Sequence, residues 1–541
     1  MPVAEDVSIF RGYTRSHPFD LPAWGVLISI ILMSIVFVFI NLDLPVVRNS
    51  VLYAQISVNL IKENFDLWKV NFDPNLGYGK PILFPLLSVP LTLLFGGNTG
   101  LVLTSFLGTL CLLMSCMWLF LRLNQLLSLP RAALSVELLV TFINPLMLYQ
   151  FWSAYPDTLF SAFFVLSFVL LDKILRDTKK THLVIIAYFA VIYFSITIKY
   201  YGLILLFIHP AYVFMNRDLL RNFSLPPGKK LTLLIAIFCF VCLLVLARFQ
   251  LNPTLNLGQA TGGGYKVYMD GFKNLDLPFH RNLACLFVFL AVTLNASVWL
   301  VIRGILADFR LIPIAVASAI FFMGLLMYPH MFFNIRFLIP VIPFLALAIS
   351  VAVFRSRFKN SNRKIFLFSL ALNLALSIYF NHQATFMFFE PYSKKLTSIQ
   401  HSYLSQLFWK VNMYYLDSLR MREHIKIQKN WNNINQHIPP GATLYMVGAD
   451  YYEDSLHGIY EQLGFVRNDI VVKYVALIDD IKSSEQDFYL FLWRDNIDVH
   501  KVFDQRVLAL QNSLYKVVTS NSLDEHAARR GSKDKNNPPT R

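Results

Sequence analysis

The sequence predicts a mainly α-helical integral membrane protein with a small α/β domain near its C-terminal end. Roughly ten apolar segments recur between about Leu21 and Phe380, and about 20 apolar residues of helix cross a hydrocarbon core about 30 Å thick. The composition agrees, because 56% of the residues are hydrophobic and only 15% are charged. After His382 the apolar segments give way to short β-like runs separated by helical stretches, a pattern typical of an α/β domain.

The formal net charge of +15 is spread over short loops between the apolar segments. No basic domain stands apart from them, which argues against nucleic-acid binding. Short loops rich in Lys and Arg are expected on the cytoplasmic side of a membrane. The basic loops are 122–131, 173–180, 217–230, 303–310 and 355–364.

These loops share one side of the membrane only if the run Ile82–Phe95 does not cross it. This run is short and contains Pro85 and Pro90, which remove backbone donors that hydrocarbon cannot replace. We therefore expect a helix lying against the outer face. About eleven spans then remain, at 21–40, 100–121, 132–152, 156–171, 182–198, 202–215, 231–247, 283–302, 311–328, 337–354 and 365–381.

The predicted domain organisation follows from these spans. Residues 1–20 are expected in the cytoplasm, and 21–381 form a transmembrane domain with outer loops at 41–99 and 248–282. Residues 382–520 form the α/β domain on the periplasmic or lumenal side, and the polar tail 521–541 is expected to be disordered. The expected strands are Thr443–Val447, Ile470–Val475, Phe488–Trp493 and Tyr515–Val518, with helices around Glu453–Gly464 and Val499–Gln511.

Charged residues beside the outer ends of spans are the candidates for chemistry, since an Asp, Lys or Arg at the centre of a membrane helix costs roughly 2.5–3.5 kcal/mol. Asp43 follows the first span and is either a solvated helix-end carboxylate or a base that accepts a proton from an acceptor group. Lys80 either snorkels to water or holds a lipid phosphate. Asp157 either meets the positive end of a helix dipole or orients a lysine or a sugar hydroxyl.

Two further cations lie at the predicted outer face. Lys199 ends one span, and Arg336 opens another after Tyr328 and His330. They are either ordinary flanking charges or a pair that stabilises a phosphate or diphosphate leaving group. No cofactor is predicted. A divalent cation could bind Asp43, Asp66 and Asp73 if the first outer loop brought them together, although their spacing gives no support for a metal site.

Four stretches in this order resemble the integral-membrane C-type glycosyltransferases, particularly the protein O-mannosyltransferases and the bacterial aminoarabinose lipid A transferases. The matching residues are Leu52-Tyr53-Ala54-Gln55-Ile56 with Asn64-Phe65-Asp66, Gly79-Lys80-Pro81-Ile82-Leu83-Phe84 with Leu94-Phe95-Gly96, Tyr155-Pro156-Asp157-Thr158-Leu159, and Arg336-Phe337-Leu338-Ile339-Pro340 with Pro343. The resemblance spans about residues 21–355.

The resemblance implies a helical bundle that moves a sugar, as a hexosyl or pentosyl group, from a polyprenyl-phosphate carrier to a lipid, glycan or protein on the outer face, usually with inversion. Lys80, Lys199 and Arg336 would hold the lipid phosphate, beside Tyr53, Tyr328 and His330. Asp157 would order the cavity, and a carboxylate of the first outer loop would act as the base.

The chain departs from the family pattern before Tyr53. Asn49 and Ser50 stand where the family has an Asp-Glu pair, and Gly79 replaces an acid before Lys80. Either Asp43 has taken over the role of base, or the chain is an inactive relative that acts as a binding or assembly subunit. A transporter or flippase is a third reading, for which the sequence lacks internal repeats with matched broken helices. The absence of glycosylation sequons in the outer segments favours a multi-pass protein of the bacterial inner membrane.

Overall fold

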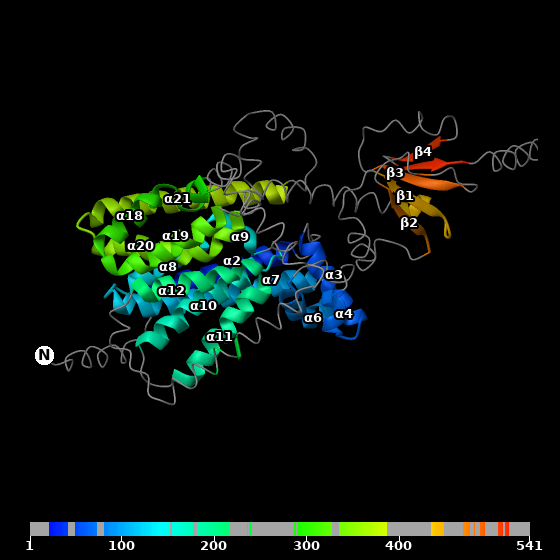
Figure 1. Ribbon diagram of the computed structural model, residues 1–541. Helices are drawn as coiled ribbons and strands as arrows, with labels where there is room; N and C mark the ends of the chain where they lie inside the picture. Colours follow the sequence, from blue (N-terminus) through cyan, green and yellow to red (C-terminus); the bar gives the residue numbers. More distant parts are fainter. Residues whose placement is uncertain are drawn as a thin grey trace, which may run out of the picture. The chain divides into compact units, whose positions relative to one another are not determined.

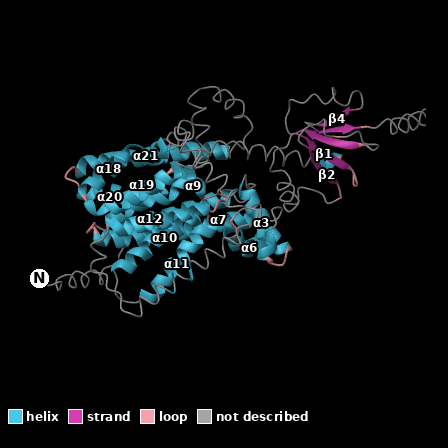
Figure 2. Cartoon of the chain, viewed as in Figure 1, coloured by secondary structure: helices cyan, strands magenta, loops and turns pink. Residues whose placement is uncertain are grey.

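The computed structural model describes the greater part of the predicted membrane domain and the sheet that follows it. The described residues are 21–41, 49–72, 81–151, 154–176, 181–215, 235, 237, 239–240, 286–287, 289–326, 335–386, 434–447, 469–475, 481, 487–492, 507–511 and 514–518. The chain divides into two compact units, one made of residues 1–95 and 99–419 and the other of 420–541 with 96–98. The first unit is helical (Figure 1), and the second is built around a β-sheet (Figure 2).

The apolar runs of the sequence form the helices of the first unit. The helices are α2 (Leu21–Asn41), α3 (Asn49–Lys62), α4 (Leu67–Phe72), α6 (Leu83–Phe95), α7 (Gly97–Leu126), α8 (Ala132–Phe142), α9 (Pro145–Gln150), α10 (Asp157–Arg176), α11 (Thr181–Ile198), α12 (Leu205–Met215), α18 (Val298–Ala307), α19 (Ile312–Leu326), α20 (Ile342–Arg355) and α21 (Lys359–Phe386). Short irregular turns connect several of them, namely η1 (Tyr200–Ile204), η2 (Leu290–Leu294), η3 (Asn295–Ser297), η4 (Phe309–Leu311) and η6 (Ile335–Val341).

The predicted number of spans is not confirmed. Three described helices are long and apolar enough to cross a membrane, at Thr99–Leu126, Asp157–Arg176 and Arg336–Arg355. A fourth candidate is the pair Asn295–Ala307 and Phe309–Met323, whose axes meet at 109°. The other described apolar stretches, such as Ala23–Val36 within α2, have 10–17 residues. Length and composition therefore support a membrane protein but not a count of eleven.

Two predicted spans contain interruptions. The predicted span 132–152 divides into α8 and α9, because the Asn144 side chain takes over backbone bonds: it donates to the carbonyl of Thr141 (2.9 Å) and accepts from the amide of Met147 (3.0 Å). The predicted span 283–302 is interrupted at Asn295, whose φ of 40° is outside the helical range. There the side chain of Asn373 on α21 donates to the carbonyl of Thr293 (2.7 Å), so a neighbouring helix satisfies the freed backbone.

Close helix packing depends on small residues. A Cβ atom added at Gly304 on α18 would lie 1.9 Å from the carbonyl oxygen of Ala348 on α20. A Cβ at Gly108 on α7 would meet Leu159 and Thr158 of α10 at 3.0 Å. Such residues let membrane helices approach backbone to backbone, and the second contact fixes the start of α10 against α7.

Ion pairs join several basic loops at one end of the helical unit. At the end of α10, the Asp172 carboxylate accepts hydrogen bonds from Arg122 Nε (2.5 Å) and Arg176 Nε (2.6 Å). Asp172 is buried and both arginines are partly exposed. The ends of the loops 122–131 and 173–180 that carry Arg122 and Arg176 therefore lie side by side.

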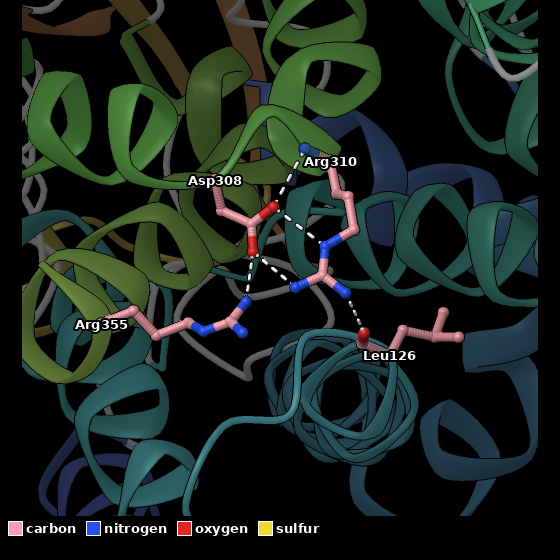
Figure 3. A network of polar contacts seen from close by, with 4 residues as sticks. All are labelled: Leu126, Asp308, Arg310 and Arg355. Carbon is pink, nitrogen blue, oxygen red and sulfur yellow. Dashed lines mark hydrogen bonds and ion pairs between the residues drawn. The ribbon is translucent and has the colours of Figure 1, made fainter.

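A second network extends this end to two further loops (Figure 3). Asp308, between α18 and η4, accepts hydrogen bonds from Arg310 and from Arg355 at the end of α20. Arg310 Nη1 also donates to the carbonyl of Leu126 at the end of α7 (2.6 Å). Four of the five basic loops thus meet at one end, which we call the basic end; the loop 217–230 lies outside the described residues.

The second unit contains a five-stranded sheet in the order β2-β1-β3-β5-β4. The strands are β1 (Thr443–Val447), β2 (Val471–Val475), β3 (Phe488–Leu492), β4 (Val507–Gln511) and β5 (Leu514–Val517). The first three are parallel to one another, whereas β5 is antiparallel to both β3 and β4. Apolar side chains cover both faces, with Leu444 and Phe491 on one face and Leu490 and Val517 on the other.

One prediction for this unit was wrong. The segment Val499–Gln511 was expected to be helical, but Val507–Gln511 forms the edge strand β4. It pairs with β5 through a register shift between Ala509 and Gln511. The leucines, alanine and glutamine of this segment suit a helix and a strand equally well, so local residue preference does not decide its structure. The pairing with β5 makes it a strand. The expected helix Glu453–Gly464 lies outside the described residues.

Candidate functional site

The site is built around the first turn of α10. Asp157 begins this helix, where a carboxylate meets the positive end of the helix dipole. The backbone around it is tied to α7: Ser105 Oγ donates to the carbonyl of Tyr155 (3.0 Å), and Thr158 Oγ1 donates to the carbonyl of Ser105 (3.2 Å). The position of the Asp157 carboxylate is therefore set by a neighbouring helix.

Two cations from distant parts of the chain converge on this carboxylate. Lys199 is the residue between α11 and η1, and its Nζ donates to Asp157 Oδ1 (2.5 Å). Arg336 lies in η6, and its Nε forms an ion pair with Asp157 Oδ2 (3.3 Å). The structure thus brings together three charged residues that lie 42 positions or more apart in the sequence.

The three charged groups are buried, and their charges do not cancel. The exposed fractions are 1% for Asp157, 7% for Lys199 and 4% for Arg336. Among the described residues, one carboxylate faces two cations, which gives these three groups a formal charge of +1 in a place where an uncompensated charge is costly. Within the described residues, Arg336 Nη1 is buried and makes no hydrogen bond. The cluster is therefore suited to receive an anion.

Aromatic rings hold the two cations in place. The Arg336 guanidinium lies 3.6 Å from the ring centroid of Tyr155, and Lys199 Nζ lies 4.8 Å from that of Phe337. Both distances are within the range of cation–π attraction. The predicted site residue Tyr53, on α3, packs its ring edge-on against Phe84 of α6, which joins these two helices of the first loop.

Four of the predicted site residues lie outside the described residues, namely Asp43, Lys80, Tyr328 and His330. No group of three His, Cys, Asp or Glu side chains suited to a metal occurs among the residues that are described. Asp66, one of the three carboxylates considered for a divalent cation, caps α4 by accepting from the amide of Lys69 (2.8 Å).

Comparisons with known proteins find relatives by structure but not by sequence. No protein-family model matches the chain, and no curated protein sequence does. Among solved structures, ArnT from Cupriavidus metallidurans matches in the apo state with a TM-score of 0.56 and 13% identity, over 92% of this chain and 98% of the ArnT chain. The chain has the fold of ArnT.

A second ArnT structure matches over the same shares of both chains, with a TM-score of 0.53 and 14% identity, and it contains bound undecaprenyl phosphate. ArnT is an aminoarabinose lipid A transferase and a C-type glycosyltransferase, so the resemblance inferred from the four short motifs is confirmed. An oligosaccharyltransferase from Archaeoglobus fulgidus also matches, with a TM-score of 0.44, 14% identity, 84% of this chain and 62% of its own.

Sequence reasoning found the three charged residues but missed the rings beside them. Tyr155 and Phe337 were noted only as motif neighbours of Asp157 and Arg336. The available signal was that each aromatic residue lies within two positions of a charged residue at a helix start. Asp172, the centre of the Arg122 and Arg176 pairs, was also missed, because it follows an apolar run without any motif.

Proposed function

We propose that the protein is a membrane glycosyltransferase that takes a sugar from a polyprenyl-phosphate carrier. The observation that carries the proposal is the buried Arg336 of the Asp157 cluster, whose Nη1 makes no hydrogen bond within the part of the chain that the structure describes. A phosphate would supply the missing negative charge and accept hydrogen bonds from the guanidinium. The ArnT fold, seen elsewhere with undecaprenyl phosphate bound, supports the same class of ligand.

In the proposed reaction, a nucleophilic group of the acceptor attacks the anomeric carbon from the face opposite the phosphate. The bond from that carbon to the phosphate oxygen breaks, and the configuration at the carbon inverts. Lys199 and Arg336 stabilise the negative charge that develops on the leaving phosphate, while Asp157 keeps both cations in position. Asp43 is the proposed base that accepts the proton of the nucleophile.

The reaction is proposed for the outer side of the membrane. The cluster lies at the start of α10 and the basic end lies at the close of the same helix. If basic loops face the cytoplasm, the cluster faces the periplasm of a bacterial inner membrane. Lys80, Tyr328 and His330 are proposed to complete the phosphate site from the adjoining loops, and the acceptor is a lipid, glycan or protein.

One observation favours a second candidate function, that of an inactive relative which binds the carrier as an assembly subunit. Asn49 and Ser50 occupy the positions of the acid pair expected before Tyr53, and an amide cannot act as a general base near neutral pH. This candidate shares the phosphate site but lacks the proton acceptor, so binding and chemistry must be measured separately.

The first experiment measures the binding of undecaprenyl phosphate to purified protein in detergent. Arg336→Gln and Lys199→Gln should each weaken binding by about tenfold or more, since a hydrogen bond to a charged group contributes about 1.5–3 kcal/mol. Arg363→Gln, an exposed charge on α21, is the matched control. Equal binding by all four proteins would refute the phosphate site.

The second experiment supplies polyprenyl-phosphate sugars with a radiolabel in the sugar. Wild-type protein should release or transfer the label, and Asp43→Asn should abolish this while it still binds undecaprenyl phosphate. Binding by the wild type without any turnover of hexose or pentose donors would instead support the inactive relative.

A further inference from the structure

A groove between three helices lies apart from the charged cluster. Helices α18, α19 and α20 enclose a cavity of about 140 Å³ that is partly open to the outside. Its walls are apolar apart from the hydroxyl group of Ser318, and include Ile305, Ile314 and Phe322. A cavity of about 150 Å³ with aliphatic and aromatic walls stays dry and accepts small apolar ligands. The groove therefore suits a hydrocarbon chain.

One end of the groove lies beside the basic end of the helical unit. Leu311 lines the groove and directly follows Arg310, whose side chain is 52% exposed. Among the described residues at this rim, Arg310 and Arg355 share the carboxylate of Asp308, so the three groups carry a formal charge of +1. The other end is reached along α19 at Phe322, eleven residues or about 16 Å further on.

The arginines at the rim retain donors for a ligand. Arg355 has five N–H donors, and one of them, on Nη1, donates to Asp308. Figure 3 shows the second terminal nitrogen of Arg355 directed away from that carboxylate. Within the Asp308 network only Nη1 of Arg355 contacts the carboxylate, and the Arg355 side chain is 35% exposed. A guanidinium with open donors next to an apolar groove matches a phosphate joined to an acyl chain.

We propose that this groove is a binding site for an anionic glycerophospholipid. One acyl chain lies in the groove between α18, α19 and α20, and the phosphate contacts Arg355 and Arg310 at the basic end. The lipid comes from the bilayer leaflet at that end, where basic pockets between membrane helices recognise anionic headgroups. The site stabilises the sharp bend between α18 and α19. It does not depend on the proposed transfer reaction, since none of its residues belongs to the Asp157 cluster.

The test for the headgroup is native mass spectrometry of the full-length protein released from detergent. With phosphatidylglycerol as the probe, the wild type should retain one lipid tightly, and phosphatidylcholine should be retained at least about tenfold more weakly. Arg355→Gln should reduce retention of phosphatidylglycerol by a similar factor, whereas Arg363→Gln, which removes an exposed charge from α21, should leave it unchanged. Equal retention of both lipids, or an equal effect of both variants, would overturn the proposal.

The test for the acyl chain uses a variant that leaves every charge in place. Ala319 is an exposed residue of α19 that lines the groove, so Ala319→Phe should block it and lower lipid retention several-fold. Ala307→Phe is the control, because Ala307 is also exposed but does not line the groove. Retention unaffected by Ala319→Phe, displacement of the lipid by inorganic phosphate alone, or replacement by undecaprenyl phosphate would each count against an acyl site for glycerophospholipids.

Discussion

Asp157 and Asp172 lie on the same helix, α10, and each is shared by two basic side chains. Asp157 pairs with Lys199 and Arg336, whereas Asp172 pairs with Arg122 and Arg176. The two carboxylates are fifteen residues apart, or about 22 Å along the helix axis. That distance separates the candidate site from the basic end by most of the thickness of a hydrocarbon core.

We predict that the two ends of α10 face opposite sides of the membrane. In a variant without its native cysteines, Ser361→Cys near the basic end should react with a membrane-impermeant thiol reagent only after the cells are opened. Trp68→Cys on the exposed surface of α4 should react in intact cells or spheroplasts. Labelling of both positions from the same side would contradict the assignment of the candidate site to the outer face.

Asp157→Asn should strongly destabilise the protein. The change removes the carboxylate that Lys199 and Arg336 share, and breaking a buried ion pair costs about 3–5 kcal/mol. The measurement is thermal unfolding in detergent, in which the variant should melt well below the wild type. Asp66→Asn is the control, because asparagine caps α4 as well as aspartate does; a comparable loss of stability in both variants would mean that the Asp157 pairs contribute little.

The ring of Tyr155, rather than its hydroxyl group, should matter for binding of undecaprenyl phosphate. Tyr155→Phe keeps the face on which the Arg336 guanidinium lies, so affinity should change by less than about twofold. Tyr155→Leu removes a cation–π contact of about 0.5–2 kcal/mol and should weaken binding by several-fold. Equal losses in the two variants would show that the hydroxyl group carries the effect.

Gly304→Ala should destabilise the helical unit by about 1–3 kcal/mol, since the added methyl group would overlap the carbonyl of Ala348 and force α18 and α20 apart. Gly25→Ala is a matched control in α2, where a Cβ atom meets nothing within 4 Å. That change should stabilise the helix by about 0.5–1 kcal/mol. Unfolding in denaturant measures both, and opposite signs are expected.

The Asp308 network should weaken in acid. Partial burial raises the pKa of Asp308, but hydrogen bonds from Arg310 and the charges of Arg310 and Arg355 outweigh it, so the pKa lies below its ordinary value. A carboxyl group whose pKa is lowered by folding contributes stability above its unfolded pKa of about 3.9, and this contribution is lost as the pH falls through the folded value. Asp308 lies in the turn between α18 and α19, outside the apolar helices.

The measurement is the difference in unfolding temperature between wild type and Asp308→Asn. The difference should be constant between about pH 6 and pH 8 and should shrink as the pH is lowered toward about 3. A difference that does not depend on pH would mean that the ionised carboxylate contributes nothing beyond the amide that replaces it.

The helical unit could be predicted from the sequence because long apolar runs indicate helices that are buried in protein or in a membrane. The sequence did not predict the breaks at Asn144 and Asn295, since each depends on side-chain amides that replace backbone hydrogen bonds, one of them from a different helix. The edge strand β4 was missed for a similar reason: its pairing with β5 is a contact between segments, and local residue preference does not contain it.

The candidate site was predicted in part because loop charge orders the spans. The alternation of basic loops places the start of α10 and the ends that carry Lys199 and Arg336 at one face, and the structure brings all three residues together. The stacking of Arg336 on Tyr155 could not be predicted, since it depends on the direction of a ring at a turn where Ala154 has a φ of 53°.

The bonds between Ser105 and the residues around Asp157 have a consequence for how new specificities could arise. They tie the Asp157 carboxylate to the packing of α7 against α10, so its position does not depend on a ligand. Segments that contribute neither to this packing nor to the proposed phosphate site can then be exchanged between related chains without displacing that carboxylate. A designer seeking a different recipient for the proposed carrier would graft such segments and leave α7, α10 and the surroundings of Lys80, Lys199 and Arg336 untouched.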